Sequence, residues 1–456
     1  MSIKTRLIIL GLCVLAFLLV TPYIVLYSLG YRVDFETLQI RGTGGIYVYA
    51  QPDPSSVMID AVSAPKSSYF SSAVFVQNLM PGPHSVLIKK DGYYDYQKSL
   101  LVKEREVAKL ENVTLFKQKI NFALLENGVD YAAISPDESA LLLATTQKAG
   151  INFDIITPGD NQKKSVILPV LNGKITEAAW SGDANKIVVT VSGNYYLLDA
   201  SLAQPVIAPL LALVGASQVT FNPQNSQELF FVKNGALYSS LKTTPIIKNV
   251  IAYHAENSSV TFLAADGFLY QSDMAGITKT SITAAAFPLN PGATYEITMA
   301  EGMTFLQENN MLFLLDKATK SFQPLSTNIS GLAHSPNNQK IAYFGDHQIF
   351  ISSAARNYMD VALLDTYSDA ITQVQWLNND YVVVVAGNTV TLSEIDNRGL
   401  PAQAGNINKV ALPSTLPLLQ GENIAMQNPV IFFRQQDKKL YIFTQKEVIV
   451  SERLVP

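Results

Sequence analysis

Side chains that carry chemistry are few in this sequence, and they are widely spaced. Its 456 residues include four histidines, which are His84, His254, His334 and His347. No Gly-x-Ser-x-Gly, no His-Glu-x-x-His and no phosphate-binding glycine loop occurs. The aspartates Asp130, Asp137 and Asp160 lack the spacing of a calcium loop. We therefore predict no catalytic residue, no cofactor and no metal ion.

Two of the histidines have a structural interpretation. His84 has no second histidine, cysteine or carboxylate pair at ligand spacing nearby, although a lone imidazole can be a metal ligand or a general base. We expect it to hydrogen-bond a turn at the start of a strand. His334 directly precedes Ser335-Pro336, where other copies of a repeat carry apolar residues, so we expect it to pack between strands.

The composition favours a folded, β-rich protein. Hydrophobic residues make up 48% and charged residues 15%, with 21 Tyr and 21 Phe. The net charge is −4 and no long basic run occurs, which argues against a nucleic-acid partner. Cys13 is the only cysteine, so the chain can form neither an internal disulfide nor a thiolate metal site.

An apolar segment near the N-terminus is long enough to cross a membrane. No charged residue occurs from Leu7 until Arg32, and about 24 helical residues span roughly 36 Å, against a hydrocarbon core of about 30 Å. We predict a cytoplasmic N-terminus (1–6), a transmembrane anchor (7–30) and a juxtamembrane linker (31–43). A cleaved signal peptide is the alternative, with Ser28-Leu29-Gly30 as a weak cleavage site.

The flanking charges predict the topology of this anchor. Lys4 and Arg6 precede the apolar segment, and basic residues favour the cytoplasmic side of a membrane. Residues after about 31 should then lie outside the cytoplasm. The membrane is thus the first predicted partner.

Residues 44–116 show the alternation of half-buried strands. Ile46 and Val48, and later Val86 and Ile88, place apolar side chains on one face. Proline- and glycine-rich turns separate these runs. The pattern predicts a small antiparallel β-sandwich.

This region resembles the PEGA domain, a β-sandwich module of bacterial and archaeal envelope proteins. The resemblance rests on nine residues: Pro52, Asp53, Pro54, Ser55, Pro81, Gly82, His84, Gly92 and Tyr93. It implies a structural module and, with the anchor, a location in the bacterial cytoplasmic membrane. The tyrosines Tyr93, Tyr94 and Tyr96 fit strand packing, and a sugar-stacking surface is the alternative.

Residues 117–456 repeat one plan of apolar strand, polar turn and apolar strand. Eight copies start between Ala132 and Ile424, about 42 residues apart on average, which is the size of a four-stranded propeller blade. The pattern predicts an all-β chain that ends in a seven- or eight-bladed β-propeller, with eight blades favoured. An array of β-sandwiches is the rival fold.

Several of these turns resemble the Ser-Pro-Asp-Gly blade motif of TolB-like and WD40-like propellers. The turn residues are Ser135, Pro136, Asp137, Ser181, Asp183, Pro223, Ser335, Pro336 and Asn337. Proline presets the turn and the acidic or amide side chain caps it. The resemblance implies a fold and names no ligand.

The sequence as a whole predicts a membrane-anchored, extracytoplasmic binding or scaffolding protein without enzymatic activity. Its propeller surface would engage protein or cell-wall glycan. Two alternatives stay open. A propeller hydrolase acting on peptide or glycan needs a carboxylate cluster or a Ser-His pair at its funnel, and a ligand sensor needs a cytoplasmic partner.

Overall fold

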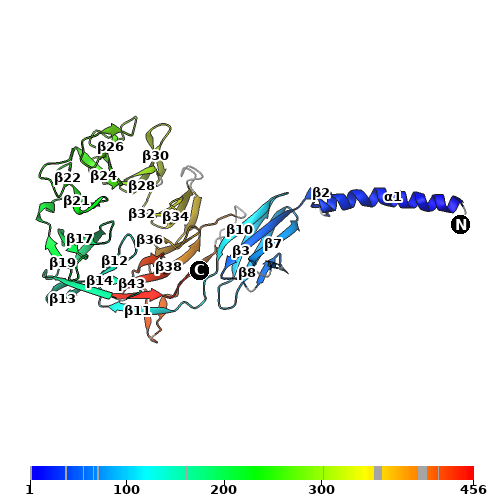
Figure 1. The fold of residues 1–456 in the computed structure, drawn as a ribbon, viewed down its shortest axis with the longest axis horizontal. Helices are drawn as coiled ribbons and strands as arrows, with labels where there is room; N and C mark the ends of the chain where they lie inside the picture. The colour runs from blue at the N-terminus through cyan, green and yellow to red at the C-terminus, as the bar shows by residue number, and fades with distance from the viewer. Residues whose placement is uncertain are drawn as a thin grey trace. The chain divides into compact units, whose positions relative to one another are not determined.

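The computed structural model describes residues 3–455, apart from 36–37, 55, 65, 69–70, 161, 301, 354–361, 399–407 and 420. These residues form two compact units (Figure 1). The first contains the N-terminal residues to Ile120 together with Ser393–Val410 and the C-terminal residues from Leu454. The second contains Asn121–Leu392 and Ala411–Arg453.

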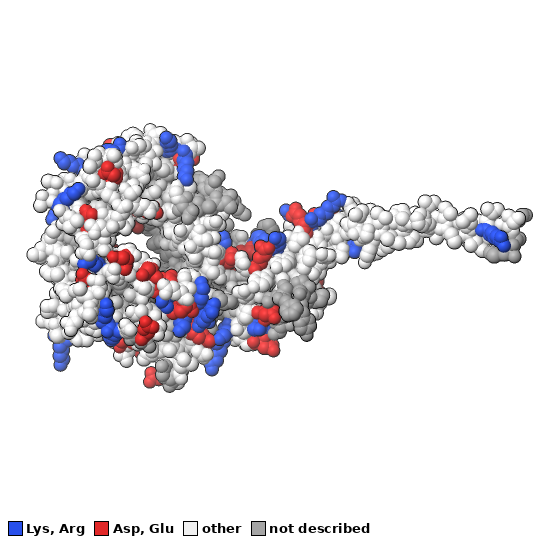
Figure 2. Space-filling view, in the orientation of Figure 1, with Lys and Arg blue, Asp and Glu red and all other residues white. Residues whose placement is uncertain are grey.

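The first unit begins with one long apolar helix. Helix α1 (Ile3–Ser28) contains Pro22, and its window Thr5–Ser28 has a mean hydropathy of 2.7 with none of it buried inside the protein. On the face seen in Figure 2, the middle of this helix shows no charged side chain. An anchor and a signal sequence share this length and composition, and α1 fits both.

A hairpin and a two-sheet module follow α1. The hairpin pairs β1 (Tyr31–Asp34) with β2 (Gln39–Gly42). One sheet of the module has the order β10 (Val107–Thr114), β3 (Gly44–Gln51), β7 (Ser71–Leu79) and β6 (Lys66–Ser68). The other has the order β5 (Val62–Ser63), β4 (Ser56–Ile59), β8 (Gly82–Lys89) and β9 (Tyr96–Val102).

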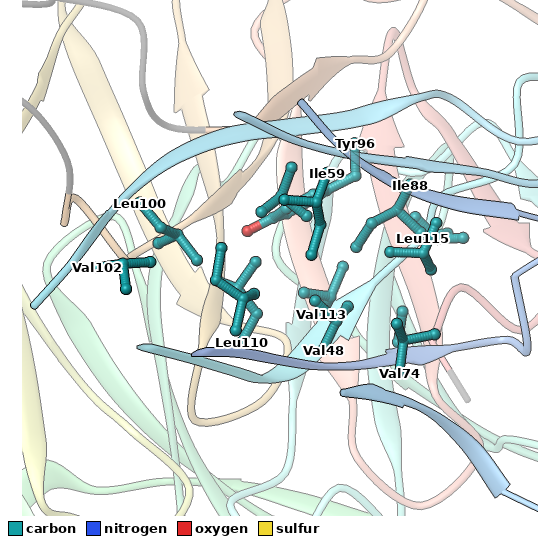
Figure 3. Packing of buried hydrophobic residues seen from close by; sticks show 14 residues of the cluster. Val48, Ile59, Val74, Ile88, Tyr96, Leu100, Val102, Leu110, Val113 and Leu115 are labelled. Atoms are coloured by element: carbon teal, nitrogen blue, oxygen red, sulfur yellow. The ribbon is translucent and has the colours of Figure 1, made fainter. Parts of the chain in front are cut away.

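The core of this module lies between its two sheets. Val48 and Leu110 from one sheet face Ile88 and Leu100 from the other (Figure 3). The alternation read from the sequence is the reason, because more buried side chains alternate with more exposed ones along β3, β8 and β9. β10 pairs with β3 in parallel, which local sequence patterns do not reveal.

Eight four-stranded sheets occur among the described residues between Phe122 and Ser451. The first four are, in strand order, β12 (Tyr131–Ile134), β13 (Leu141–Gln147), β14 (Gly150–Thr157) and β15 (Gln162–Leu168); β16 (Ile175–Trp180), β17 (Lys186–Val191), β18 (Asn194–Asp199) and β19 (Val206–Pro209); β20 (Ser217–Asn222), β21 (Asn225–Lys233), β22 (Ala236–Ser239) and β23 (Ile247–Lys248); and β24 (Val250–Glu256), β25 (Ser259–Ala264), β26 (Leu269–Asp273) and β27 (Thr280–Ser281).

The remaining four sheets continue the same up-and-down order. They are β28 (Tyr295–Ala300), β29 (Met303–Glu308), β30 (Met311–Asp316) and β31 (Ser321–Ser326); β32 (Gly331–His334), β33 (Lys340–Gly345), β34 (Gln348–Ser353) and β35 (Ala362–Thr366); β36 (Ile371–Trp376), β37 (Tyr381–Ala386), β38 (Thr389–Glu394) and β39 (Lys409–Ala411); and β42 (Val430–Arg434), β43 (Lys439–Thr444), β44 (Glu447–Ser451) and β11 (Phe122–Asn127). Outside them lie the short helix η1 (Leu211–Leu213) and the hairpin of β40 (Thr415–Pro417) with β41 (Asn423–Ala425).

The sheets of the second unit pack in succession around a ring (Figure 1). One apolar cluster joins the sheets of β13 and β17 through Phe153 and Val189, and others join later neighbours. Leu143 of the first sheet packs in one cluster with Phe432 and Tyr441 of the last. The ring is therefore closed by the same kind of apolar contact that joins the sheets within it.

The last sheet takes its fourth strand from the start of the repeat region. β11 pairs antiparallel with β44, with Phe122 opposite Ser451 and Ala123 opposite Val450. The eighth copy was predicted to begin at Ile424, but Ile424 lies in β41, and β42 is the first strand of this sheet. The start differs because the fourth strand of this sheet, β11, comes from residues more than 300 positions earlier in the chain than its partner β44. No local sequence pattern indicates such a pairing.

Candidate functional site

The described residues contain no group of three or more His, Cys, Asp and Glu side chains placed to hold a metal ion. His84 lies in the first unit, whereas His254, His334 and His347 lie on the second. In the described chain, His254, His334 and His347 do not gather into a group that could hold a metal ion. The search for a site turns to the motif residues and to charged groups that the sequence did not single out.

His84 is held between two acceptors at the start of β8. Its Nδ1 lies 2.5 Å from Oδ2 of Asp60, and its Nε2 lies 2.7 Å from the carbonyl oxygen of Met80. The other Asp60 oxygen accepts the backbone N–H of Ser85 at 2.9 Å. The ring thus ties one turn to the next, and its side chain is only 13% exposed.

The other PEGA-like residues lie in turns of the same module. Pro52, Asp53 and Pro54 connect β3 to β4, and the Asp53 carbonyl accepts a hydrogen bond from Lys90 Nζ at 2.7 Å. Ser55 lies outside the described residues. The remaining motif residues are Pro81 and Gly82 at the start of β8 and Gly92 and Tyr93 in the turn before β9.

The tyrosines of this stretch do not share one surface. Tyr96 is 3% exposed and Tyr94 is 39% exposed, while Tyr93 packs partly against the core. The Tyr96 hydroxyl donates to Glu394 Oε1 at 2.8 Å. A sugar cannot stack on all three rings, because the Tyr96 ring is buried. A sugar-stacking surface therefore cannot include Tyr96.

The Ser-x-Asp turns of the second unit repeat one geometry. Ser135 Oγ donates to Asp137 Oδ1 at 2.7 Å and accepts the N–H of Ala140 at 2.9 Å. Ser181 with Asp183, and Ser335 with Asn337, make the same pair of bonds. All three serines are at most 1% exposed. The motif therefore stabilises the turn between the first and second strands of a sheet.

Electrostatics within these turns favour ionised aspartates. Partial burial opposes ionisation of Asp183, but hydrogen bonds from Ser181, Asn185 and Ser226 outweigh it and hold its pKa at about 2. The pKa of Asp137 is lowered against a similar desolvation by bonds from Ser135 and Ser139. Pro136 and Pro336 occupy the second turn position, and Pro223 follows Asn222 at the corresponding turn after β20.

His334 lies at the end of β32 without a hydrogen bond to its Nδ1 from the described residues. Burial lowers its pKa, so the neutral ring is favoured. No carboxylate or cysteine accompanies it in a metal-binding group of the described chain.

The most buried charged cluster lies around Lys98, which the sequence patterns did not single out. Lys98 occupies a core-facing position of β9, and its side chain is 0% exposed. Its Nζ lies 2.8 Å from Glu394 Oε1 and 3.5 Å from Asp396 Oδ2. Arg398 pairs with Asp396 at 2.9 Å. A lysine that interrupts the apolar series of Tyr96, Leu100 and Val102 was the available signal.

This cluster attaches a distant segment to the edge of the sandwich. β9 ends its sheet, and the side-chain amide of Asn408 donates to the Gln97 carbonyl and accepts the Gln97 N–H, both at 3.0 Å. Asn408 thereby satisfies backbone groups that an edge strand leaves open, and an inward-pointing charge such as Lys98 disfavours pairing with a foreign strand. Each charged group of the cluster has an oppositely charged partner within it.

Comparisons with known proteins identify a fold and no family. No family model and no curated protein matches the chain. The C-terminal WD40 domain of Sif2 is 13% identical, covers 74% of this chain and 99% of its own, and superposes with a TM-score of 0.50. Sqt1 of Saccharomyces cerevisiae is 11% identical, with coverages of 74% and 98% and a TM-score of 0.46. The likeness to the Sif2 domain shows a WD40-like β-propeller fold.

Proposed function

We propose that the chain is a membrane-anchored binding or scaffolding protein whose β-propeller engages a protein or glycan outside the cytoplasm. In this proposal α1 is an uncleaved anchor, residues 44–116 are a PEGA-like module, and the eight sheets are eight blades. The protein would lie in a bacterial cytoplasmic membrane with its N-terminus in the cytoplasm.

The observation that carries the proposal is what the polar side chains of the described residues bond to. The Ser-x-Asp turns, His84 and the Lys98 cluster each satisfy groups of the fold itself. The second unit meanwhile presents large apolar side chains on its surface, including Leu211 at 78% and Ile277 at 83% exposure. Exposed apolar side chains of this kind can contribute to a contact surface for a partner.

Photo-crosslinking from defined surfaces of the propeller tests the proposal. Alternating strands place the turn at Gly182, between β16 and β17, and the turn at Ala149, between β13 and β14, at opposite ends of their sheets. Val206 lies on the outer strand β19 and is 53% exposed. A benzoylphenylalanine at each position, in the full chain in its native membrane, samples both ends and the rim.

We expect one of the three positions to form a discrete crosslink to protein or glycan, with the other two as internal controls. Gly182 accepts a side chain because no atom lies within 4 Å of the place that a Cβ would occupy. Absence of a crosslink from all three positions would contradict the proposal. Turnover of a peptide or glycan by the purified chain would instead favour the hydrolase.

A further inference from the structure

A small cavity lies at the C-terminal end of α1, inside the first unit. Its volume is about 150 Å³. Tyr23, Leu26 and Tyr27 of α1 form one side, and Arg32, Phe35 and Ile40 of the following hairpin form the other. Apolar cavities of about this size hold a small apolar group such as a benzene ring.

The surroundings of the cavity are those of a membrane boundary. Phe35 is 85% exposed and Ile40 is 57% exposed. Both apolar side chains lie soon after the apolar helix α1 in the chain. The rings of Tyr23 and Tyr27 lie 6.1 Å apart between centroids and are tilted by 35°, and tyrosines are enriched where lipid meets water. The apolar walls would therefore face the part of the lipid chains that is nearest the headgroups.

A single guanidinium gives the cavity its charge. Arg32 lies 3.5 Å above the ring of Tyr27, and one of its Nη atoms donates to the carbonyls of Tyr27 and Tyr31, each at 2.8 Å. These bonds use both hydrogens of that nitrogen and leave Nε and the second Nη available. Among the described residues no carboxylate pairs with Arg32, whereas Arg41 of the same hairpin lies 3.7 Å from Asp34.

We propose that this cavity binds one phospholipid of the leaflet in which α1 ends. The glycerol and first chain carbons lie against Leu26, Phe35 and Ile40, and the phosphate accepts hydrogen bonds from Arg32, a geometry that guanidinium groups favour. A free phosphate has no apolar part for these walls. The inference rests on the proposed function, because it requires α1 to remain in the membrane.

Lipid retention by the full chain provides the test. The chain is extracted in mild detergent, mixed with dioleoyl phosphatidylglycerol and examined by native mass spectrometry. We expect one retained lipid per chain, and about tenfold weaker retention for Arg32→Gln, as for the loss of one charged hydrogen bond. Phe35→Asn should weaken retention as well. Inorganic phosphate at millimolar concentration should not displace the lipid.

Matched variants separate the cavity from general membrane affinity. Arg41→Gln removes a charge from the same hairpin, and Leu38→Asn removes an equally exposed apolar side chain, at 80%, that does not line the cavity. Asn also suits the positive φ of 54° at Leu38. Both variants should retain lipid like the wild type, and all four should show the wild-type circular dichroism melt.

Three results would overturn the inference. The first is equal retention by the Arg32→Gln and Arg41→Gln variants, the second is no retained lipid in a chain that is still membrane-bound after carbonate washing, and the third is displacement of the lipid by inorganic phosphate. Failure of the proposed function is distinguishable, because the chain would then be released by carbonate. Displacement by inorganic phosphate would assign the site to a free anion.

Discussion

At the scale of single residues, the polar groups of this protein act on their own turns. Ser181 is buried and bonds Asp183, and the backbone after them closes the turn through Lys186 N–H to Ser181 Oγ at 2.9 Å. The sequence predicted these turns from their serine, proline and aspartate positions. It did not predict the left-handed φ of 55° at Ala184, where the related motif has glycine.

Ionisation of Asp183 should make the second unit more stable above pH 4. Its pKa of about 2 in the folded protein is below the ordinary aspartate value of 3.8, so the stabilisation is present above the unfolded value and is lost as pH falls from about 4 to 2. Amide hydrogen exchange of β16 and β17 at several pH values measures this. Asp183→Asn should flatten that dependence, and an unchanged profile would contradict the assignment.

The buried cation Lys98 should be essential to the stability of its own unit. Lys98→Met leaves the carboxylate of Glu394, whose side chain is 5% exposed, without its cation. Removal of one partner from a buried ion pair costs about 3–5 kcal/mol. Hydrogen exchange of β9 amides in the full chain gives the local opening free energy, which should fall by that amount.

A second variant tests whether the unpaired charge of Glu394 causes the loss of stability in Lys98→Met. Glu394→Gln in the Lys98→Met background removes that charge and keeps an oxygen that accepts from the Tyr96 hydroxyl. The double variant should be more stable than Lys98→Met alone. Additive losses from the two substitutions would show that the pair contributes only by packing.

At the scale of elements, local patterns predicted strands well and their partners less well. Alternation placed Val86 and Ile88 on one face, and both are 0% exposed. The polar turns identified most first and second strands of the sheets. The parallel pair of β3 with β10, the closure by β11, and the attachment of Ser393–Val410 through Lys98 all join distant residues, so no local pattern encodes them.

Closure by β11 should hold the whole ring together. Proline at Ala123 removes an N–H from β11 and disturbs its ladder with β44. We expect the melting temperature of the second unit to fall by several degrees, with faster exchange in both the first and the last sheet. Differential scanning calorimetry and hydrogen exchange measure the two effects.

The matched control is proline at Ile167, which is 47% exposed on the outer strand β15. This strand belongs to a sheet whose four strands are consecutive in the chain. The effect should stay within that sheet. Equal effects of the two prolines would mean that β11 has no special role in closure.

At the scale of the whole molecule, two β-rich units share the chain, and the apolar helix belongs to the first of them. The chain passes between the units after Ile120, Leu392, Val410 and Arg453. The sequence indicated the helix by its long apolar run, the sandwich by its alternation, and the repeat by copies about 42 residues apart. The sequence could not separate residues 393–410 from the repeat. That segment belongs to the first unit through side-chain contacts, which no local sequence pattern reveals.

The central claim is that α1 stays in the membrane and holds the propeller outside the cytoplasm. Its most direct test places a single cysteine at the exposed turn residue Ala149, in the full chain with Cys13→Ser. A membrane-impermeant maleimide is then applied to intact cells and to lysed cells. The claim predicts labelling in intact cells of a full-length chain that sediments with membranes. Labelling only after lysis, or a shortened chain in the soluble fraction, would contradict it.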